Sequence, residues 1–353
     1  MTVPRRVLCE VMLFGSGGRN LCRVGSGHRE LEYYRRIAQH YEVLIFEYDD
    51  PEPQWLGAGL RSVPRHLRSR LLHSTIGAWL AGRQSPPPAI IRTKQFWGAW
   101  AGVMLSRASS RPLIIRMGYH WSYNFILERR IRNRALAGLI RGFERWLLRF
   151  ADGIVFGSER LAQAFPEKTV PWIVAPNGID PGLFSPATEP AQFDLIYVGR
   201  LLPIKGFDRL VPLLPRGGRI RIIGAGPLEH LLADRPDIER MERVDNEQLP
   251  GFLRSARCFV SMSRTEGSPK ALLEAIFCGC YPILSDIGPH RALVEELGYG
   301  VLLPADAKSI AMEQALAESR VDREKLAVFR INYSMDRLVA LEVDFLNRIA
   351  AHV

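Results

Sequence analysis

The sequence is poor in cysteine and has no long uninterrupted run of apolar residues. Its 353 residues include five cysteines, an odd number without any C-x-x-C pair. A disulfide framework or a zinc site is therefore not expected, and a reducing cytosol suits the chain best. No stretch of 18 apolar residues occurs, so no transmembrane helix is predicted. The apolar stretch after the short basic N-terminus contains Glu10, which favours a buried first strand over a signal peptide.

Acidic residues are scarce in the first half of the chain. Residues 1–180 contain 26 lysines and arginines against 14 aspartates and glutamates, whereas residues 181–353 contain 21 against 23. The net charge of +10 therefore comes from the N-terminal half. This half is expected to meet something anionic, such as a phosphorylated lipid, an anionic membrane surface or nucleic acid.

Strand and helix patterns alternate along almost the whole chain, which predicts an α/β architecture with parallel sheets. The predicted strands cover residues 7–14, 42–47, 90–93, 113–116, 153–156, 194–198, 219–223, 258–262 and 281–285. The predicted helices cover residues 29–40, 134–150, 208–214, 228–233, 248–256, 269–277, 290–297 and 335–349. Turn formers cluster at Pro176–Pro181, and the domain boundary is predicted just after them.

The most informative stretch follows the predicted strand 258–262. Ser268 is a favourable N-cap and Pro269 suits the first helical position. The helix should therefore begin at the carboxyl edge of a parallel sheet, where α/β proteins bind ligands. The backbone N–H groups of Lys270 and Ala271, together with the helix dipole, would form a phosphate site there.

Two glutamates flank this helix start. Glu274 lies roughly 7.5 Å along the helix axis from Pro269. This distance suits the separation between a diphosphate and a ribose, and a carboxylate can accept hydrogen bonds from the ribose hydroxyls. Glu266 lies in the preceding loop, within reach of a sugar. Taken alone, the stretch is equally compatible with a capped helix that carries one solvated glutamate.

The spacing Glu266-Gly267-Ser268-Pro269 to Glu274 resembles the signature of the family-4 retaining glycosyltransferases of GT-B fold, the glycosyl transferases group 1. Further motifs occur in the same order as in that family. They are Asn177–Asp180, Tyr197–Leu201 with Lys205–Asp208, Ile222–Pro227 and Glu274–Ile283. Such an ordered set is far more specific than any one of its members.

The resemblance implies an α/β protein of GT-B architecture, with two facing Rossmann-like domains and parallel sheets. An acceptor-binding domain would span residues 1–181 and a donor-binding domain residues 182–334. The C-terminal helix, within 335–353, would return to the first domain. The implied reaction retains the anomeric configuration. It moves a hexose-type sugar from a nucleoside diphosphate sugar, UDP first and GDP second, to a hydroxyl of a glycan or lipid-linked saccharide in cell-envelope polysaccharide or glycoconjugate biosynthesis.

The resemblance also implies roles for single residues. Arg200 and Lys205 would hold the donor diphosphate and oppose the charge that develops on the leaving phosphate. Glu266 would bind hydroxyls of the donor sugar and Glu274 the ribose. The other implied donor-binding positions are Gly199, Gly224, Gly226, Val244, Gly267, Ser268, Pro269, Lys270 and Ala271.

The N-terminal half resembles the family more loosely. The loop Gly15-Ser16-Gly17-Gly18 follows the first strand, where it could approach a phosphate or the acceptor, or simply form a tight turn. Arg116 ends a short buried strand and is assigned to the same acceptor and phosphate site. His120 would lie near the reacting sugar and could hydrogen-bond it or carry a proton. A lone histidine is equally compatible with a structural role.

No carboxylate is an obvious covalent nucleophile. The resemblance implies front-face attack, in which the leaving phosphate takes the proton of the acceptor. The sequence contains no D-x-D metal motif, and the pair Asp49 and Asp50 is adjacent rather than spaced by one residue. No metal and no other cofactor is therefore expected.

Two basic segments combine arginines with apolar residues. The helix 134–150 is expected to pack its apolar face on the sheet and leave its arginines in water. For residues 61–72, packing and contact with an anionic membrane both remain open. The expected location is the cytoplasm, with peripheral contact at the inner face of the membrane as an open option.

Other functions compete with this interpretation. A synthase or phosphorylase of the same fold is one, although the short chain and the lack of a pyridoxal phosphate lysine motif disfavour a phosphorylase. A nucleic-acid-binding or membrane-binding protein on this scaffold is another, but no nucleic-acid motif occurs and no nucleic acid is expected as a partner. A pseudo-enzyme is disfavoured by the four residues Arg200, Lys205, Glu266 and Glu274.

Overall fold

The structure is a computed structural model that describes residues 6–13, 27–48, 57, 59–63, 65, 67–83, 87–129, 131 and 133–351. The chain folds into two compact units. The first comprises Met1–Pro176 with Leu338–Val353, and the second comprises Asn177–Arg337. The domain limits predicted from the sequence lie at residues 181 and 335.

The first unit is built on a seven-stranded parallel sheet with the order β3-β2-β1-β4-β5-β6-β7. Its strands are β1 (Val7–Met12), β2 (Glu42–Glu47), β3 (Leu60–Ser62), β4 (Ile90–Thr93), β5 (Leu113–Met117), β6 (Gly153–Phe156) and β7 (Trp172–Val174). The strand order reverses between β1 and β4, which is typical of a doubly wound sheet.

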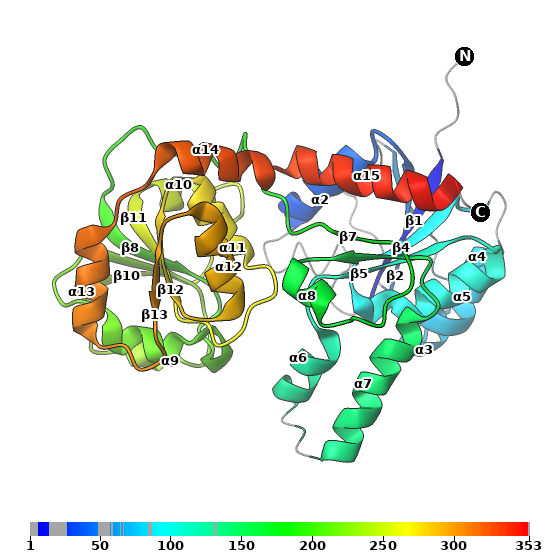
Figure 1. The fold of residues 1–353 in the computed structure, drawn as a ribbon, viewed down its shortest axis with the longest axis horizontal. Helices are drawn as coiled ribbons and strands as arrows, with labels where there is room; N and C mark the ends of the chain where they lie inside the picture. The colour runs from blue at the N-terminus through cyan, green and yellow to red at the C-terminus, as the bar shows by residue number, and fades with distance from the viewer. Residues whose placement is uncertain are drawn as a thin grey trace. The chain divides into compact units, whose positions relative to one another are not determined.

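Helices cover both faces of this sheet. They are α2 (Gly27–Ile37), α3 (Arg70–Leu72), α4 (Ala78–Gly82), α5 (Ala99–Ser109), α6 (Trp121–Glu128), α7 (Arg134–Leu148), α8 (Glu159–Gln163) and the C-terminal α15 (Met335–Ala351). α2 and α15 lie on one face, and α4, α5 and α7 lie on the other (Figure 1).

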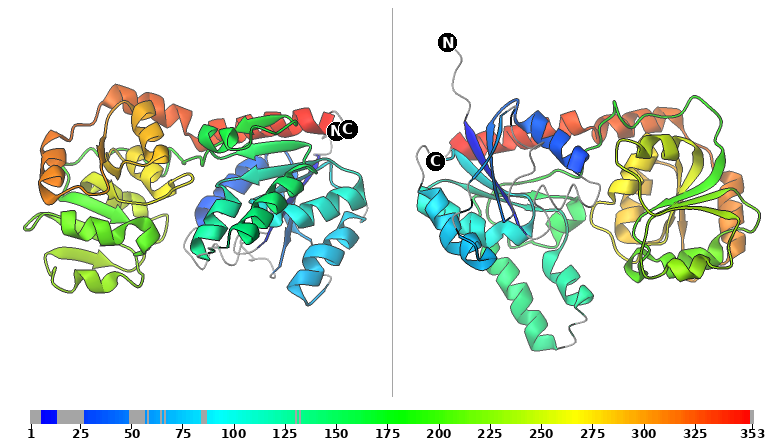
Figure 2. Two further views of the ribbon diagram at one scale, coloured as in Figure 1. Left: turned by 60° about the horizontal axis from the view of Figure 1, so that its bottom comes forward. Right: turned by 180° about the vertical axis from the view of Figure 1, so that it is seen from behind.

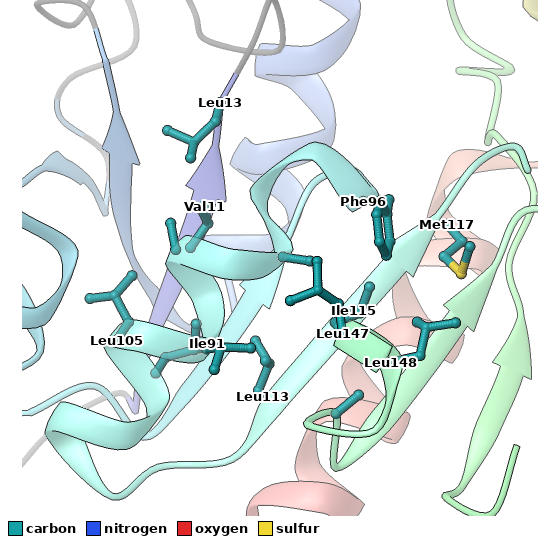
Figure 3. Packing of buried hydrophobic residues seen from close by; sticks show 14 of the residues in the cluster. Val11, Leu13, Ile91, Phe96, Leu105, Leu113, Ile115, Met117, Leu147 and Leu148 are labelled. Atoms are coloured by element: carbon teal, nitrogen blue, oxygen red, sulfur yellow. The ribbon is translucent and has the colours of Figure 1, made fainter. Parts of the chain in front are cut away.

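The core between the sheet and α5 and α7 contains both aliphatic and aromatic side chains (Figure 3). Val11 and Ile91 of the two central strands lie near Leu105 of α5, and Leu147 of α7 belongs to the same cluster. All four side chains are at most 1% exposed. Parallel strands with helices on both faces are buried on both sides, which explains why β5 and β6 are almost continuously apolar.

The second unit repeats the architecture with a six-stranded parallel sheet of order β10-β9-β8-β11-β12-β13. Its strands are β8 (Phe193–Val198), β9 (Ile220–Ile223), β10 (Ile238–Met241), β11 (Ala256–Ser261), β12 (Tyr281–Ser285) and β13 (Val301–Leu303). Its helices are α9 (Phe207–Leu210), α10 (Leu249–Arg254), α11 (Lys270–Phe277), α12 (Gly288–Leu297), α13 (Ser309–Glu318) and α14 (Arg323–Asn332).

Neighbouring residues of β8 enter two different cores. Leu195 and Tyr197 pack with residues of α9 and α13, whereas Ile196 packs with residues of α10, α11, α12 and α14. This alternation is the two-residue period of a strand that is covered on both faces. Figure 2 shows the helices on both sides of this sheet from two further directions.

Three predicted elements differ from the structure. The predicted helix 208–214 is a single α-helical turn, α9, followed by the 3₁₀ turn Val211–Leu213, which contains Pro212 and therefore lacks one backbone N–H donor. The predicted helix 228–233 is the 3₁₀ segment Glu229–Leu232. The third is α7, which ends at Leu148 and does not bury its whole apolar face. The side chains that it leaves exposed are Leu136, Leu139, Phe143 and Trp146.

Candidate functional site

The strand order of the second unit reverses between β8 and β11, which lie side by side. The loops that leave these two strands therefore diverge to opposite faces of the sheet. In open α/β sheets, ligands bind at such a point, outside the carboxyl ends of the strands. The two loops contain Arg200 and Lys205 after β8, and Glu266 after β11.

Glycines allow the backbones to approach closely at this edge. Gly206 has φ of +63°, and a Cβ there would lie 1.6 Å from the carbonyl oxygen of Met262. Gly224 has φ of +155°, and a Cβ there would lie 1.9 Å from the carbonyl oxygen of Gly199. Only glycine fits such positions. Contact of Gly224 or Gly226 with a nucleotide stays a prediction.

An ion pair joins the two loops. Lys205 Nζ lies 2.7 Å from Glu266 Oε1, and the side chains are 30% and 11% exposed. The Ser263 hydroxyl donates a second hydrogen bond to the same carboxylate oxygen, at 2.7 Å. Both residues are thus held in place by partners, which a site for a charged ligand requires. Arg200 is exposed, and its carbonyl oxygen accepts a hydrogen bond from Tyr197 Oη at 2.9 Å.

A buried chain of polar groups supports this pair from beneath. Ser263 Oγ lies 3.1 Å from Ser261 Oγ, and the Ser285 hydroxyl donates to the Ser263 carbonyl at 2.7 Å. Ser285 Oγ in turn lies 3.1 Å from Nδ1 of His290, a fully buried residue of α12. Burial lowers the pKa of His290 below its ordinary value, because the charged form loses hydration. Sequence reasoning missed these residues, since serine at a strand end is too common to signal a site.

The start of α11 differs from the prediction in its cap. Pro269 is the cap residue, the helix begins at Lys270, and no side chain caps it. The Ser268 hydroxyl instead accepts a hydrogen bond from the Asn177 backbone N–H at 3.3 Å, and Asn177 Nδ2 donates to the Ser268 carbonyl at 3.1 Å. Asn177 belongs to the turn cluster recognised in the sequence, but its link to α11 was not foreseen.

Glu274 faces the interior of the second unit and is 1% exposed. Its Oε1 accepts a hydrogen bond from Asn246 Nδ2 at 3.1 Å. Asn246 is buried as well, and its side-chain oxygen has no hydrogen-bond partner within the described part of the chain. Asn246 follows the half-buried Val244, one of the predicted donor contacts. The pair therefore offers a carboxylate and an unsatisfied amide group at one place.

In the first unit, His120 is held by an acidic partner. His120 Nδ1 lies 3.3 Å from Oε2 of Glu144, a buried residue of α7. The Ser122 hydroxyl donates to the same oxygen at 2.5 Å, and the Ser122 backbone N–H donates to Glu144 Oε1 at 3.2 Å. Glu144 is therefore a buried acceptor that orients the imidazole, and the helix pattern of α7 alone did not indicate this role.

Arg116 takes part in a buried ionic network rather than standing alone. Its Nε lies 3.6 Å from Glu342 Oε1 on α15, and its Nη2 donates to the Ala175 carbonyl at 3.2 Å. The Arg92 guanidinium donates to both Glu10 and Glu342, at 2.7 Å each. This network attaches α15 to the sheet of the first unit. The loop Gly15-Ser16-Gly17-Gly18 lies outside the described residues, so its predicted role stays a prediction.

The described residues contain neither a candidate metal-binding cluster nor a membrane-spanning helix. No group of three or more His, Cys, Asp or Glu side chains among them could hold a metal ion. No helix in the described part of the chain is long and apolar enough to cross a membrane. The expectation that the reaction needs no metal or cofactor stays a prediction.

Comparison with known proteins identifies relatives of this chain. Residues 192–318 match the model of the family described as glycosyl transferases group 1. The GDP-mannose:cellobiosyl-diphosphopolyprenol alpha-mannosyltransferase of Xanthomonas oryzae pv. oryzae is 31% identical over 183 residues, which are 46% of this chain and 48% of that protein. The chain thus spans about half the length of this curated relative.

Two solved structures resemble this chain over almost its whole length. Sucrose-phosphate synthase from Thermosynechococcus elongatus has a TM-score of 0.78 at 18% identity and covers 99% of this chain and 100% of its own. HepE from Anabaena, solved in complex with UDP and glucose, has a TM-score of 0.69 at 15% identity and covers 98% and 100%. The predicted GT-B fold is confirmed. The predicted resemblance to group 1 glycosyltransferases is confirmed for residues 192–318.

Proposed function

We propose that this chain, whose residues 192–318 match the glycosyl transferases group 1, is a retaining glycosyltransferase with its donor site in the second unit. One observation carries the proposal. Lys205 and Glu266 belong to two loops that meet at the switch point of the sheet, and their charged groups lie 2.7 Å apart. A cation, and a carboxylate that can accept hydrogen bonds from sugar hydroxyls, therefore lie where α/β folds bind nucleotides.

The chemistry of the pair suits transfer from a sugar nucleotide. Cleavage of the bond between sugar and phosphate leaves negative charge on a phosphate oxygen, and a fixed cation in a partly buried site opposes it. Lys205, 30% exposed and held by Glu266, is such a cation. Arg200 supplies a second positive charge in the same loop and can bind phosphate through two nitrogens.

The proposed reaction retains the anomeric configuration without a covalent sugar–enzyme intermediate. Glu266 Oε1 accepts hydrogen bonds from Lys205 and Ser263, which fix the carboxylate in an orientation suited to binding sugar hydroxyls. In the proposed reaction the acceptor hydroxyl attacks from the side of the leaving phosphate, and that phosphate takes the proton. Glu266 binds hydroxyls of the sugar, and no metal or other cofactor takes part.

The proposed donor is a nucleoside diphosphate hexose, and the proposed acceptor a glycan or lipid-linked saccharide. Sequence reasoning favours UDP before GDP, whereas the Xanthomonas relative is named for GDP-mannose and a diphosphopolyprenol-linked acceptor. HepE was solved with UDP and glucose. The four cysteines within the described part of the chain are free and buried, which agrees with the proposed location in the cytoplasm. The proposed role there is in polysaccharide or glycoconjugate biosynthesis.

The test is an acceptor-dependent transfer assay. The full chain is incubated with UDP-glucose or GDP-mannose and a polyprenyl-diphosphate-linked disaccharide, and nucleotide release and the anomeric configuration of the product are measured by NMR. We expect acceptor-dependent release of one nucleoside diphosphate and a product with the configuration of the donor. A folded chain that binds the nucleotide sugar but never turns it over would be a pseudo-enzyme. Inverted product would overturn the retaining mechanism.

A further inference from the structure

A long stretch of the first unit contains no acidic residue. Between Glu52 and Glu128, residues 53–127 include ten lysines and arginines and no aspartate or glutamate. Three of the ten, Arg92, Lys94 and Arg116, are directed inward to Glu10, Glu30 and Glu342. The other seven are exposed, and one of them, Arg61, pairs with Glu42.

Within this stretch lies a continuous helical segment, formed by α3, the π-helical turn His73–Gly77 and α4. Its inner face is fixed in the unit. His73 is fully buried, stacks on Phe46 with ring centroids 4.6 Å apart, and its Nε2 lies 3.0 Å from the Glu47 carbonyl oxygen. Ala78 is likewise fully buried. The orientation of the segment is therefore set, and its opposite face must meet the surroundings.

That opposite face is apolar, which is unusual for the outer side of a surface helix. Its side chains follow the helical spacing i, i+4, i+7, i+8 and are each 40% to 51% exposed. We name them the outer stripe: Leu72, Ile76, Trp79 and Leu80. Leu71, at the start of the segment, is 70% exposed.

Arginines border the outer stripe at both ends. Arg68 and Arg70 precede it and Arg83 follows it, and all three are exposed. The Arg83 guanidinium lies 4.7 Å from the centre of the Trp79 ring, so the cation stands directly beside an apolar member of the stripe. α7 differs, since its arginines lie on the side of the helix away from its exposed apolar residues, and Arg145 is paired with Glu167 at 2.7 Å.

We propose that the outer stripe, with Arg68 and Arg83, is a docking surface for an anionic lipid bilayer. A helix with exposed leucine, isoleucine and tryptophan beside arginines lies in the interface of a membrane, with its apolar side chains below the head groups and its cations among the phosphates. No acidic residue of the stretch 53–127 opposes binding to an anionic surface. The proposal depends on the proposed function in one respect, namely that docking would bring the chain to a lipid-linked acceptor.

The test is co-sedimentation with vesicles, in the absence of any nucleotide sugar. The full chain is mixed with vesicles of phosphatidylcholine alone or with added phosphatidylglycerol. The apolar variant carries Leu72→Ser, Ile76→Ser and Leu80→Ser, and the charge variant carries Arg68→Ser and Arg83→Ser. The matched control is Val328→Ser with Ile331→Ser on α14 of the second unit, where two side chains of similar size are 60% and 66% exposed.

We expect the wild type and the control to sediment with anionic vesicles. The apolar variant should bind at least about tenfold more weakly, since each lost apolar side chain removes buried area, and the charge variant should lose its preference for phosphatidylglycerol. A wild type that stays in the supernatant, or an apolar variant that binds like it, overturns the proposal. So does a concentration-dependent dimer that the apolar variant abolishes, or retention on RNA in place of vesicles. Because no donor is used, failure here is distinct from failure of the transfer assay.

Discussion

Lys205 and Glu266 are 61 residues apart in the sequence, yet Lys205 Nζ lies 2.7 Å from Glu266 Oε1. The contact depends on β8 and β11 being neighbouring parallel strands, so that the loops after both strands leave the same edge of the sheet. Gly206, directly after Lys205, is packed against the Met262 carbonyl, directly before Ser263. The pair is thus positioned by backbone packing.

We predict that Asn246→Ala weakens binding of a nucleoside diphosphate by about tenfold but leaves pyrophosphate binding unchanged. Asn246 Nδ2 donates to Glu274, and one hydrogen bond to a charged group contributes about 1.5–3 kcal/mol. If Glu274 holds the ribose, only ligands with a ribose are affected. Isothermal titration with both ligands measures the difference, and equal losses for the two would refute the ribose assignment.

We predict that Glu144→Gln lowers kcat by about 10-fold to 100-fold, because the Glu144 carboxylate lies 3.3 Å from His120 Nδ1 and positions the imidazole. His120→Ala should lower kcat by a similar factor. The double variant should lower kcat no more than the more damaging single variant, because the effects of residues that act as a unit are not additive. Fully additive losses in kcat would mean that Glu144 acts on folding alone. Thermal melting of the three variants is the control.

His290 makes stability depend on pH. Its pKa is lowered by burial, so the unfolded chain binds a proton that the folded chain does not. Stability should therefore fall as pH decreases below the ordinary histidine pKa of about 6.5. We predict that His290→Asn flattens the pH dependence of the unfolding free energy between about pH 7 and 5. Urea unfolding at several pH values measures it, and an unchanged slope would contradict the account.

We predict that Glu342→Gln lowers the unfolding free energy of the first unit by about 3–5 kcal/mol, since it leaves the buried Arg92 partly unpaired. Asp344→Asn on the same helix is the matched control. Asp344 pairs with Arg348 at 3.3 Å, but both side chains are more than half exposed, so a change of about 0–1 kcal/mol is expected. Denaturant unfolding followed by tryptophan fluorescence tests both, and equal effects would exclude a role for the network.

The repeating strand and helix periods of this chain were sufficient to predict two parallel sheets, because strands covered on both faces must be apolar throughout. Four strands of three or four residues escaped, namely β3, β7, β10 and β13. These strands lie at the edges of the two sheets. Edge strands are short and half solvated, and so lack the apolar run that marks a buried strand. Two of them, β7 and β10, expose Trp172 and Glu239.

The residues of the candidate site that lie within sequence motifs could be predicted, but the residues that hydrogen-bond to them could not. Lys205 and Glu266 lie in ordered motifs, whereas Asn246, Ser285 and His290 reach the site only through tertiary contacts. The Ser268 cap was wrongly predicted because the Asn177 backbone competes for the same hydroxyl. The helix α7 was expected to hide its apolar face, but helical period alone does not tell which of two apolar stripes faces the sheet.

The central claim is that the second unit binds a nucleoside diphosphate through Lys205. The most direct measurement is the melting temperature of the wild type and of Lys205→Ala with UDP, GDP, ADP and CMP, with exposed Lys308→Ala as the control. At about 100 times its dissociation constant a ligand stabilises the folded state by roughly 2.7 kcal/mol. We predict that one diphosphate raises the melting temperature of the wild type and of Lys308→Ala, and that the shift disappears in Lys205→Ala. Absence of any shift in the wild type, or an equal shift in Lys205→Ala, would contradict the claim.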